Sequence, residues 1–539
     1  MKRSKSVDAF ASENLPPRES WPTFLPGNAG FAPPARFNVV SEILDSWVEK
    51  GHGGRDALFF PGGLWTYADL AERVNRIANV LTGPLGLIPG NRVLLRAPNS
   101  AMLVASYLAI LKAGLIAVPT MPMMRAKELK TPLEKAKINA ALCAHSLVEE
   151  LDLAITAGGS AIRMVTFGQE DSELEGLMAQ ASPVFAAHDT AADDVCLFAF
   201  TSGTTGGPKA TMHFHRDVLA IADGYARHIL APTPEDRFIG SPPLAFTFGL
   251  GGLVIFPLRF GASSVLLDRA GPDDLLDAFR TYRPTIVFTA PTAYRAIAAK
   301  VKREDVVSLR ICVSAGEGLP RSTFELWRGV TGLELMDGIG STEMLHIFIA
   351  SPPGAVRPGA TGKPVPGYEA RIIDESGNDV PDGQPGLLAV RGPTGCRYLA
   401  DHRQAIYVRQ GWNVTGDTYI RDADGYFWYQ ARSDDMIISA GYNISGPEVE
   451  EAMLTHPAVA ECGVIGQPDE DRGTLVTAAV VLKPGHQGDA AMVKALQDHV
   501  KATIAPYKYP RRVLFLNELP KTATGKLSRT LLRQTLAQG

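Results

Sequence analysis

The chain has 539 residues, of which 45% are hydrophobic and 20% charged, and a formal net charge of −4 at pH 7. This length predicts two or more globular domains, and the slightly acidic balance argues against nucleic acid as the main partner. The five cysteines are scattered without a C-x-x-C pair, which favours a reducing compartment and argues against a disulfide scaffold or a zinc site: Cys143, Cys196, Cys312, Cys396 and Cys462.

The N-terminal segment, MKRSKSVDAFASENLPPRESW, begins with basic residues and then becomes polar and acidic. Because it lacks an apolar core, we expect neither a secretory signal nor a membrane anchor. The most apolar stretch, residues 101–124, is interrupted by Lys112, Gly114 and two prolines, so a buried helix that runs into a strand is favoured over a transmembrane span. We therefore expect a cytoplasmic protein without a membrane partner.

A turn rich in glycine and hydroxyl residues, AFTSGTTGGPKAT, occupies residues 199–211. It follows a buried-strand pattern at 193–200 and precedes a helical apolar period over 215–230, so we predict a strand, a phosphate loop and a helix. Backbone N–H groups, hydroxyls and the cation of Lys209 suit a phosphate. The loop departs from the P-loop pattern, because Pro208 precedes the lysine and Ala210 replaces the hydroxyl that would bind magnesium. On composition alone, a structural turn remains the alternative.

Further along the chain, short β-branched runs alternate with helical periods. Three such pairs follow one another, at 261–268 with 273–282, 285–291 with 292–301, and 309–316 with 322–330. This alternation predicts layered α/β structure around a largely parallel sheet.

Beyond about residue 355 the sequence pattern changes to short strand-like runs separated by Gly/Pro-rich turns, which predicts a small β subdomain. After residue 453, alternating short helices and strands predict a separate α+β unit. We place the domain boundary at Asp434 and Asp435. The expected domains are residues 1–433, a large N-terminal domain, and residues 434–539, a small C-terminal domain.

Five motifs occur in a fixed order: TSGTTGGPK (201–209), DGIGSTEM (337–344), TGD (415–417), ARSDDMIISAGYNISGPEVEEAM (431–453) and LPKTATGKLSR (519–529). Together they resemble the adenylate-forming enzymes, the superfamily of acyl- and aryl-CoA synthetases, peptide-synthetase adenylation domains and luciferases. The resemblance covers essentially the whole chain. In the chemistry that it implies, a carboxylate attacks the α-phosphorus of ATP and pyrophosphate leaves, so cations and N–H donors are needed where charge develops.

The resemblance assigns roles to individual residues. It implies that Thr342 and Glu343 meet the α-phosphate and Mg²⁺, that Asp417 binds the ribose hydroxyls with help from Arg432, and that the β- and γ-phosphates are held by Thr201, Ser202, Gly203, Thr204, Thr205 and Lys209. The implied adenine wall consists of Gly316, Glu317, Gly318, Asp337 and Gly338. The magnesium is also expected on chemical grounds, since one lysine cannot neutralise a polyphosphate. Any of these carboxylates taken singly is more commonly a solvated surface group.

The resemblance implies that the N-terminal domain, 1–433, binds ATP and the acid and that the C-terminal domain, 434–539, is a mobile lid. It implies catalytic roles for two residues of this C-terminal domain. Lys526 is expected to bridge the substrate carboxylate and the nucleotide during adenylation. Asp434 matches a hinge at which the C-terminal domain swings before the thiol reacts. The acceptor could be coenzyme A, a carrier-protein phosphopantetheine or oxygen. Because no carrier-like module is attached, a free-standing CoA ligase is the most economical interpretation, with a carrier-loading enzyme and a non-catalytic nucleotide-binding regulator as alternatives.

The predicted acid pocket resembles those of benzoate–CoA ligases and, more closely, 2-aminobenzoate–CoA ligases. The motifs that carry this likeness are MHFHRDVLAIAD, SPPLAFTFGLGGLVIFPLRFGAS, FTAPTAYRA and DGIGSTEMLHIF. They imply a short, flat slot for one aromatic ring, formed by Phe248, Ala290, Ala315, Ile339, Gly340 and His346. Core packing is the alternative for Phe248 and Ile339, and a satisfied core histidine for His346. A ligase for another small carboxylic acid is the alternative at the level of function.

Overall fold

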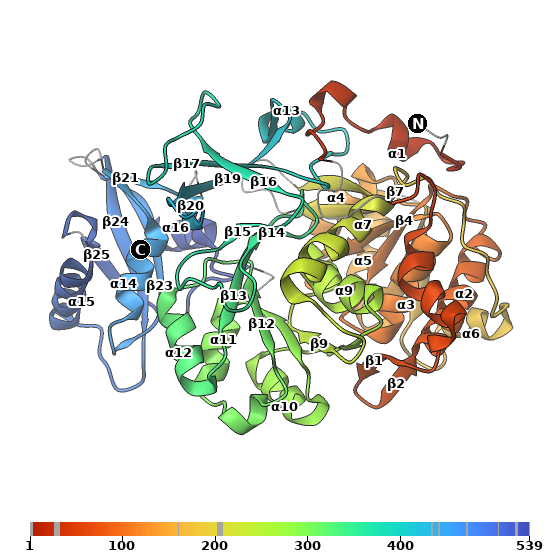
Figure 1. Cartoon of the computed structure of the whole chain (residues 1–539), viewed down its shortest axis with the longest axis horizontal. Coiled ribbons are helices and arrows are strands. Elements are labelled where there is room, and N and C mark those ends of the chain that lie inside the picture. The colour runs from red at the N-terminus through yellow and green to blue at the C-terminus, as the bar shows by residue number, and fades with distance from the viewer. Residues whose placement is uncertain are drawn as a thin grey trace.

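Alternating strands and helices build the first layer of the fold (Figure 1). The computed structural model describes residues 4–25, 33–159, 161–201, 208–432, 435–439, 442–469, 473–504, 506–522 and 526–537. One six-stranded sheet has the order β6-β5-β3-β4-β7-β8 and is parallel except for β8. Its strands are β3 (Arg92–Arg96), β4 (Ile116–Thr120), β5 (Ala140–Ala144), β6 (Arg163–Phe167), β7 (Val195–Thr201) and β8 (Lys209–Phe214).

Two helices of this first half begin at side-chain caps. At the start of α2 (Tyr67–Thr82), the Thr66 hydroxyl accepts from the Asp69 N–H while the Asp69 carboxylate accepts from the Thr66 N–H. At the start of α3 (Ala101–Lys112), the Ser100 hydroxyl accepts from the Leu103 N–H. The other helices are α1 (Phe10–Glu13), α4 (Ala126–Lys135), α5 (Val148–Gly158) and α6 (Glu173–Gln180). The apolar stretch at 101–124 is therefore a buried helix running into a strand, and among the described residues no helix is long and apolar enough to cross a membrane.

A second, nine-stranded sheet carries the middle of the chain, in the order β15-β14-β13-β12-β11-β9-β10-β1-β2. Its central strands are parallel and buried on both faces, which explains their continuous apolar runs. The strands are β1 (Asp56–Phe60), β2 (Gly63–Thr66), β9 (Arg237–Gly240), β10 (Ser263–Val265), β11 (Ile286–Thr289), β12 (Ile311–Ala315), β13 (Leu335–Gly340), β14 (Ile347–Ala350) and β15 (Lys363–Pro364). The accompanying helices are α7 (His215–Ile221), α8 (Thr247–Leu250), α9 (Phe256–Arg259), α10 (Pro272–Tyr282), α11 (Pro291–Ala298) and α12 (Arg321–Thr331).

The segment after the glycine-rich loop corrects one prediction. A strand, β8, follows the loop and pairs back on β7 in antiparallel register, with Thr201 opposite Lys209, and only then does helix α7 begin. The alternating KATMHF sequence buries its residues within the sheet, and the predicted helical period over 215–230 is helical from His215 onward. The two described ends of the loop therefore lie side by side on a hairpin, and the loop does not lead directly into a helix.

A five-stranded antiparallel sheet forms the predicted β subdomain. It consists of β16 (Glu369–Ile373), β17 (Pro385–Arg391), β18 (Val408–Arg409), β19 (Trp412–Arg421) and β20 (Phe427–Arg432), with the short helix α13 (Gln404–Tyr407) at its edge. Antiparallel pairing places Asp417 of β19 opposite Arg432 of β20.

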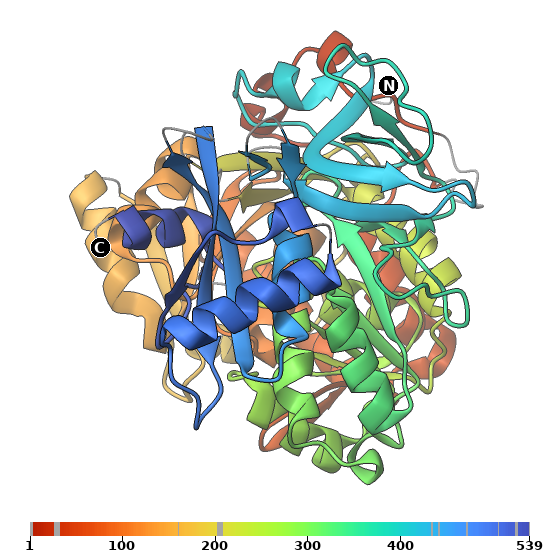
Figure 2. The same ribbon diagram turned by 90° about the vertical axis from the view of Figure 1, so that its left-hand side faces the viewer.

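The remaining elements form what we call the C-terminal unit, on the left of Figure 1 and in front in Figure 2. Its described strands pair with one another, and its apolar residues form a core of their own, which includes Val449, Val464 and Leu496. The elements are β21 (Ile437–Ser439), β22 (Tyr442–Ile444), α14 (Gly446–Leu454), β23 (Val459–Asp469), β24 (Gly473–Leu482), α15 (Ala490–Thr503), β25 (Arg512–Phe515) and α16 (Arg529–Ala537).

Candidate active site

A cavity of about 630 Å³ lies where the nine-stranded sheet, the β subdomain and the C-terminal unit meet. The ends of β12 and β13, the start of α8, strands β19 and β20, and one lysine of the C-terminal unit all contribute to its wall. The predicted site residues that line it are Thr201, Lys209, Phe248, Ala315, Gly316, Glu317, Gly318, Asp337, Gly338, Ile339, Gly340, Thr342, Glu343, His346, Asp417, Arg432 and Lys526. The fold thus brings together residues more than three hundred positions apart.

Six predicted residues are not found in this wall. Ala290 precedes α11 as its N-cap and is not among the lining residues. The other five lie outside the described residues: Ser202, Gly203, Thr204, Thr205 and Asp434.

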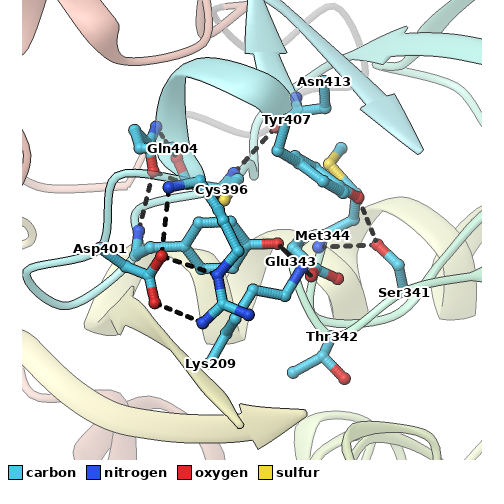
Figure 3. A network of polar contacts seen from close by, with 12 residues as sticks. Lys209, Ser341, Thr342, Glu343, Met344, Cys396, Asp401, Gln404, Tyr407 and Asn413 are labelled. Atoms are coloured by element: carbon cyan, nitrogen blue, oxygen red, sulfur yellow. Dashed lines mark hydrogen bonds and ion pairs between the residues drawn. The ribbon is translucent and has the colours of Figure 1, made fainter. Parts of the chain in front are cut away.

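One end of the cavity carries a buried pair of opposite charges (Figure 3). The Lys209 ammonium lies 3.7 Å from Oε1 of Glu343, and both side chains are largely buried. The hydroxyl of Tyr398 contacts both groups: Lys209 Nζ donates to it at 2.8 Å, and it donates to Glu343 Oε1 at 2.5 Å. A lysine and a carboxylate facing one cavity can bind a phosphate and a hard cation respectively.

The donor set near Glu343 fits a magnesium ion that is carried by nucleotide phosphates. Among the described residues, no group of three or more His, Cys, Asp or Glu side chains is arranged to hold a metal ion. Mg²⁺ is commonly bound through one or two carboxylates together with substrate phosphates, and Glu343, which lines the cavity beside Lys209, can be such a carboxylate.

The Thr342–Glu343 turn is supported from behind by a buried polar chain that the sequence did not indicate. Nε2 of His213 donates to the Thr342 carbonyl at 2.8 Å, and Nδ1 lies 3.6 Å from the Asp217 carboxylate. Asp217 is in turn paired with the fully buried guanidinium of Arg397. Because a carbonyl can only accept, His213 Nε2 must carry a proton in this contact.

Asp337 and Asp417 are among the carboxylates that line the side of the cavity where the nucleotide is expected. Burial raises the pKa of Asp337 to about 7, and its Oδ1 is buried without a hydrogen-bond partner. Such an acceptor can receive an amino group, for example that of adenine. Asp417 lies 3.6 Å from the Arg432 guanidinium across the β19–β20 pair, so this carboxylate is oriented by a neighbouring cation.

Lys526 enters from the C-terminal unit. Its ammonium lies 5.1 Å from the centre of the Phe246 ring. Burial lowers its pKa, and the nearby Glu317 carboxylate opposes that shift. At Gly316, whose φ is +95°, an added Cβ would lie 3.0 Å from Lys526 Cε and 3.1 Å from Nζ, so the absence of a side chain there gives the lysine its room.

The other end of the cavity is aromatic. The His346 ring is packed among Phe256, Tyr225 and Phe248, with ring centres at 4.6, 5.4 and 5.8 Å. Burial lowers its pKa to about 3, so the imidazole is neutral. Nε2 contacts the Phe248 carbonyl at 3.4 Å and is the protonated nitrogen, which leaves Nδ1, buried without a partner, as an acceptor. Phe248 and Ile339 both line the cavity and pack against the main core. They therefore belong both to the predicted pocket and to the core packing that was the alternative.

Several lining residues were missed by the sequence reasoning. Tyr407 contacts Ser341 through its hydroxyl at 3.3 Å, and Arg403 is held by Asp401 through two hydrogen bonds at 2.8 and 2.6 Å. These residues lie in the segment CRYLADHRQAIYVR, which has no glycine-rich signature. Only its closeness to the TGD motif at 415–417 could have drawn attention to it.

Comparison with known proteins identifies relatives along the whole chain. The model of the AMP-binding enzyme family matches residues 44–398, and that of the AMP-binding enzyme C-terminal domain matches residues 448–526. A benzoate–CoA ligase of Thauera aromatica is 37% identical over 516 residues, which cover 93% of this chain and 96% of the relative.

Two solved structures resemble the fold closely. The anthranilate CoA ligase AuaEII in complex with anthranoyl-AMP has a TM-score of 0.89 and 35% identity, covering 95% of this chain and 99% of that one. A benzoate CoA ligase from Burkholderia xenovorans LB400 has a TM-score of 0.86 and 34% identity, covering 92% of this chain and all of that one (100%).

Proposed function

We propose that this chain activates an aromatic carboxylic acid with ATP and transfers it to coenzyme A. The chain belongs to the family of AMP-binding enzymes and is an acid–thiol ligase of the AMP-forming type. The preferred acid is of the 2-aminobenzoate or benzoate type. The observation that carries this proposal is that one cavity holds three features together. Lys209 and Glu343 form its charged end, Phe248 and His346 form its aromatic end, and Lys526 enters it from the C-terminal unit.

The first half-reaction needs no protein nucleophile. A carboxylate oxygen of the acid attacks the α-phosphorus, the new acyl–O–P bond forms, and the bond to the β-phosphate breaks to release pyrophosphate. Lys526 brings the two anions together, and Thr342 meets the α-phosphate. The loop residues Thr201, Ser202, Gly203, Thr204 and Thr205, with Lys209, hold the leaving phosphates. When bound, Mg²⁺ on Glu343 neutralises developing charge on those phosphates.

The nucleoside is held on the other wall. Asp337, with its unpartnered Oδ1, accepts from the adenine amino group, while Gly316, Glu317, Gly318 and Gly338 form the rest of the adenine wall. Asp417, oriented by Arg432, accepts from the ribose hydroxyls.

In the second half-reaction the thiol of coenzyme A attacks the carbonyl of the adenylate, the acyl–sulfur bond forms, and AMP leaves with its oxygen. We assign the domains as 1–433 and 434–539, with Asp434 as the hinge at which the C-terminal domain moves between the two steps. Lys526 serves the first step only. The buried, unpaired cysteines are consistent with a cytoplasmic location.

His346 favours 2-aminobenzoate over benzoate. Its Nδ1 is a buried acceptor without a partner, and an ortho-amino group on the bound ring supplies the missing donor. Satisfying a buried acceptor is worth about 1–3 kcal/mol, or roughly 5- to 150-fold in specificity. The likeness to an anthranilate CoA ligase supports the same choice.

A substrate panel tests the proposal. Purified protein is given ATP, Mg²⁺ and free coenzyme A with 2-aminobenzoate, benzoate, 4-hydroxybenzoate or octanoate, and AMP and the acyl-CoA are quantified. We expect the highest kcat/KM for 2-aminobenzoate, then benzoate, and very little product from octanoate. A preference for octanoate would reject the aromatic assignment. Adenylate formation without any thioester from free coenzyme A would instead indicate a carrier-protein acceptor.

A further inference from the structure

One buried phenol joins the two charged groups at the phosphate end of the cavity. Tyr398 is fully buried, and its hydroxyl lies 2.8 Å from Lys209 Nζ and 2.5 Å from Glu343 Oε1. Figure 3 shows Lys209 and Glu343 turned toward the same point. An ammonium can only donate and a carboxylate can only accept, so the phenol receives from the lysine and gives its own proton to the glutamate.

The backbone fixes this phenol relative to both partners. The segment around Tyr398 runs antiparallel to β8, where the Leu399 N–H donates to Ala210 and the Met212 N–H donates to Arg397. Lys209 is the first residue of that same strand. The hydroxyl position is therefore set by the fold before any ligand binds.

A second tie reaches the loop that carries Glu343. The buried Thr394 hydroxyl donates to the Met344 carbonyl at 2.8 Å, four residues before Tyr398 in the chain. The Tyr398 N–H donates to Gln404 Oε1 at 2.9 Å, which holds the tyrosine from its other side. The phenol is thus anchored to the strand that carries Lys209 and to the turn that carries Glu343.

The phenol remains protonated in this position. The Lys209 ammonium can only donate and the Glu343 carboxylate can only accept, so the hydroxyl keeps its proton for the contact with Glu343. The Lys209 ammonium also lies 4.7 Å from the centre of the Tyr398 ring, on its face, where a cation is attracted by the ring quadrupole. The ring therefore holds the lysine by two contacts, one at the hydroxyl and one at the face.

We propose that Tyr398 is a positioning residue, a spacer whose hydroxyl holds Lys209 and Glu343 in a loose ion pair at 3.7 Å, beyond hydrogen-bond distance. This spacing leaves the lysine available to phosphate and the glutamate available to magnesium. This inference rests on the proposed function. The two charges are 3.7 Å apart with the phenol in place, and removing the hydroxyl allows them to pair directly. A lysine and a carboxylate that neutralise each other serve neither the nucleotide nor its metal.

The test is Tyr398→Phe, which removes the hydroxyl and keeps the ring. Equilibrium binding of ATP is measured with Mg²⁺ and with EDTA, for the wild type and the variant. We expect the Kd for ATP with Mg²⁺ to rise about tenfold, as for loss of one hydrogen bond to a charged group. We also expect the gain in affinity that Mg²⁺ provides to fall, because Glu343 is then paired with Lys209.

The matched control is Tyr67→Phe, a fully buried tyrosine whose hydroxyl donates to the Ala262 carbonyl at 2.8 Å and which does not line the cavity. It should bind ATP like the wild type under both conditions. A merely structural role for Tyr398 would weaken both Kd values equally and leave the magnesium gain unchanged, which would overturn the proposal. Values within twofold of the wild type for Tyr398→Phe would overturn it as well.

A crystal structure of the wild type with Mg²⁺ and a non-hydrolysable ATP analogue gives a second test if Tyr398→Phe does not fold. We expect the Tyr398 hydroxyl to stay within about 3.2 Å of both Lys209 Nζ and the Glu343 carboxylate, while the lysine also contacts a phosphate. A structure in which the phenol has left both groups would contradict the spacer role. Failure of the wild type to bind ATP would instead reject the proposed function itself.

Discussion

Gly251→Ala should push a histidine into the aromatic end of the cavity. Gly251 follows α8 in a buried helical segment, and a Cβ built there would lie 2.3 Å from Cδ2 of His346, 2.7 Å from its Nε2 and 3.2 Å from Cζ of Phe256. Ordinary contacts begin near 3.4 Å. The ring must therefore move by roughly 1 Å in an interior packed to crystal-like density.

The direction of that movement follows from the neighbours of His346. Rings of Phe256, Tyr225, Phe248 and Phe288 pack around it, and His346 also lines the cavity. Overpacking of this kind costs about 1–3 kcal/mol, and when it falls on the bound acid it lowers kcat/KM roughly 5- to 150-fold. The charged end of the cavity is untouched, so the KM for ATP should stay within about twofold.

Acid-dependent ATP–pyrophosphate exchange with 2-aminobenzoate and with benzoate measures this effect. Gly329→Ala is the control, because Gly329 lies exposed on α12 with nothing within 4 Å of an added Cβ and should leave exchange unchanged. The double variant Gly251→Ala/His346→Ala should recover exchange with benzoate, since it removes the ring that is displaced. Unchanged kcat/KM in Gly251→Ala, or an equal rise in the KM for ATP, would refute the placement of His346 beside the acid.

Three further predictions follow from other parts of the structure. Lys526→Ala should lower the rate of adenylate formation at least about 100-fold, while the reaction of a supplied aryl-adenylate with coenzyme A should continue. Equal loss of both rates would contradict a role in the first step alone. Asp337→Asn should remove a pH dependence of stability. The unfolded chain loses this proton near its ordinary pKa of 3.8, whereas the native state keeps it up to about pH 7, so wild-type stability falls as pH rises between these values, by about 4 kcal/mol over the whole interval. Urea unfolding at pH 5 and 7.5 covers about 2.5 kcal/mol of that fall and should show it in the wild type but not in the variant. Arg397→Met should destabilise the fold by about 3–5 kcal/mol in urea, because Asp217 is left buried without its partner, and Arg397→Met/Asp217→Asn should regain part of that loss.

Local patterns were sufficient to predict the layers of the fold. Runs such as TIVFTAP and LRICVSAG became the buried parallel strands β11 and β12 because their composition and flanking turns agree with their tertiary surroundings. The strand β8 was missed since KATMHF follows a loop and precedes a helical period, so its pairing with β7 is visible only in three dimensions.

The residues of the candidate site also fall into two groups: those that sequence motifs predicted and those that only the three-dimensional structure reveals. Motif residues such as Glu343, Asp417 and Lys526 were predicted from a resemblance, and the fold brings them to one cavity. Tyr398 was missed because its contact with Lys209 spans 189 positions in the chain and carries no local signature. His213 was missed for a related reason, since its partner is the backbone carbonyl of Thr342 and not a side chain.

The most direct test of the account is to trap the intermediate. Enzyme, ATP, Mg²⁺ and 2-aminobenzoate are mixed without coenzyme A, and the protein-bound product is identified by mass spectrometry. We predict 2-aminobenzoyl-AMP in an amount close to that of the enzyme, with pyrophosphate released, and its conversion to 2-aminobenzoyl-CoA and AMP when coenzyme A is added. Absence of any aryl-adenylate, or an adenylate that forms only with octanoate, would contradict the assignment of this cavity to an aromatic acid.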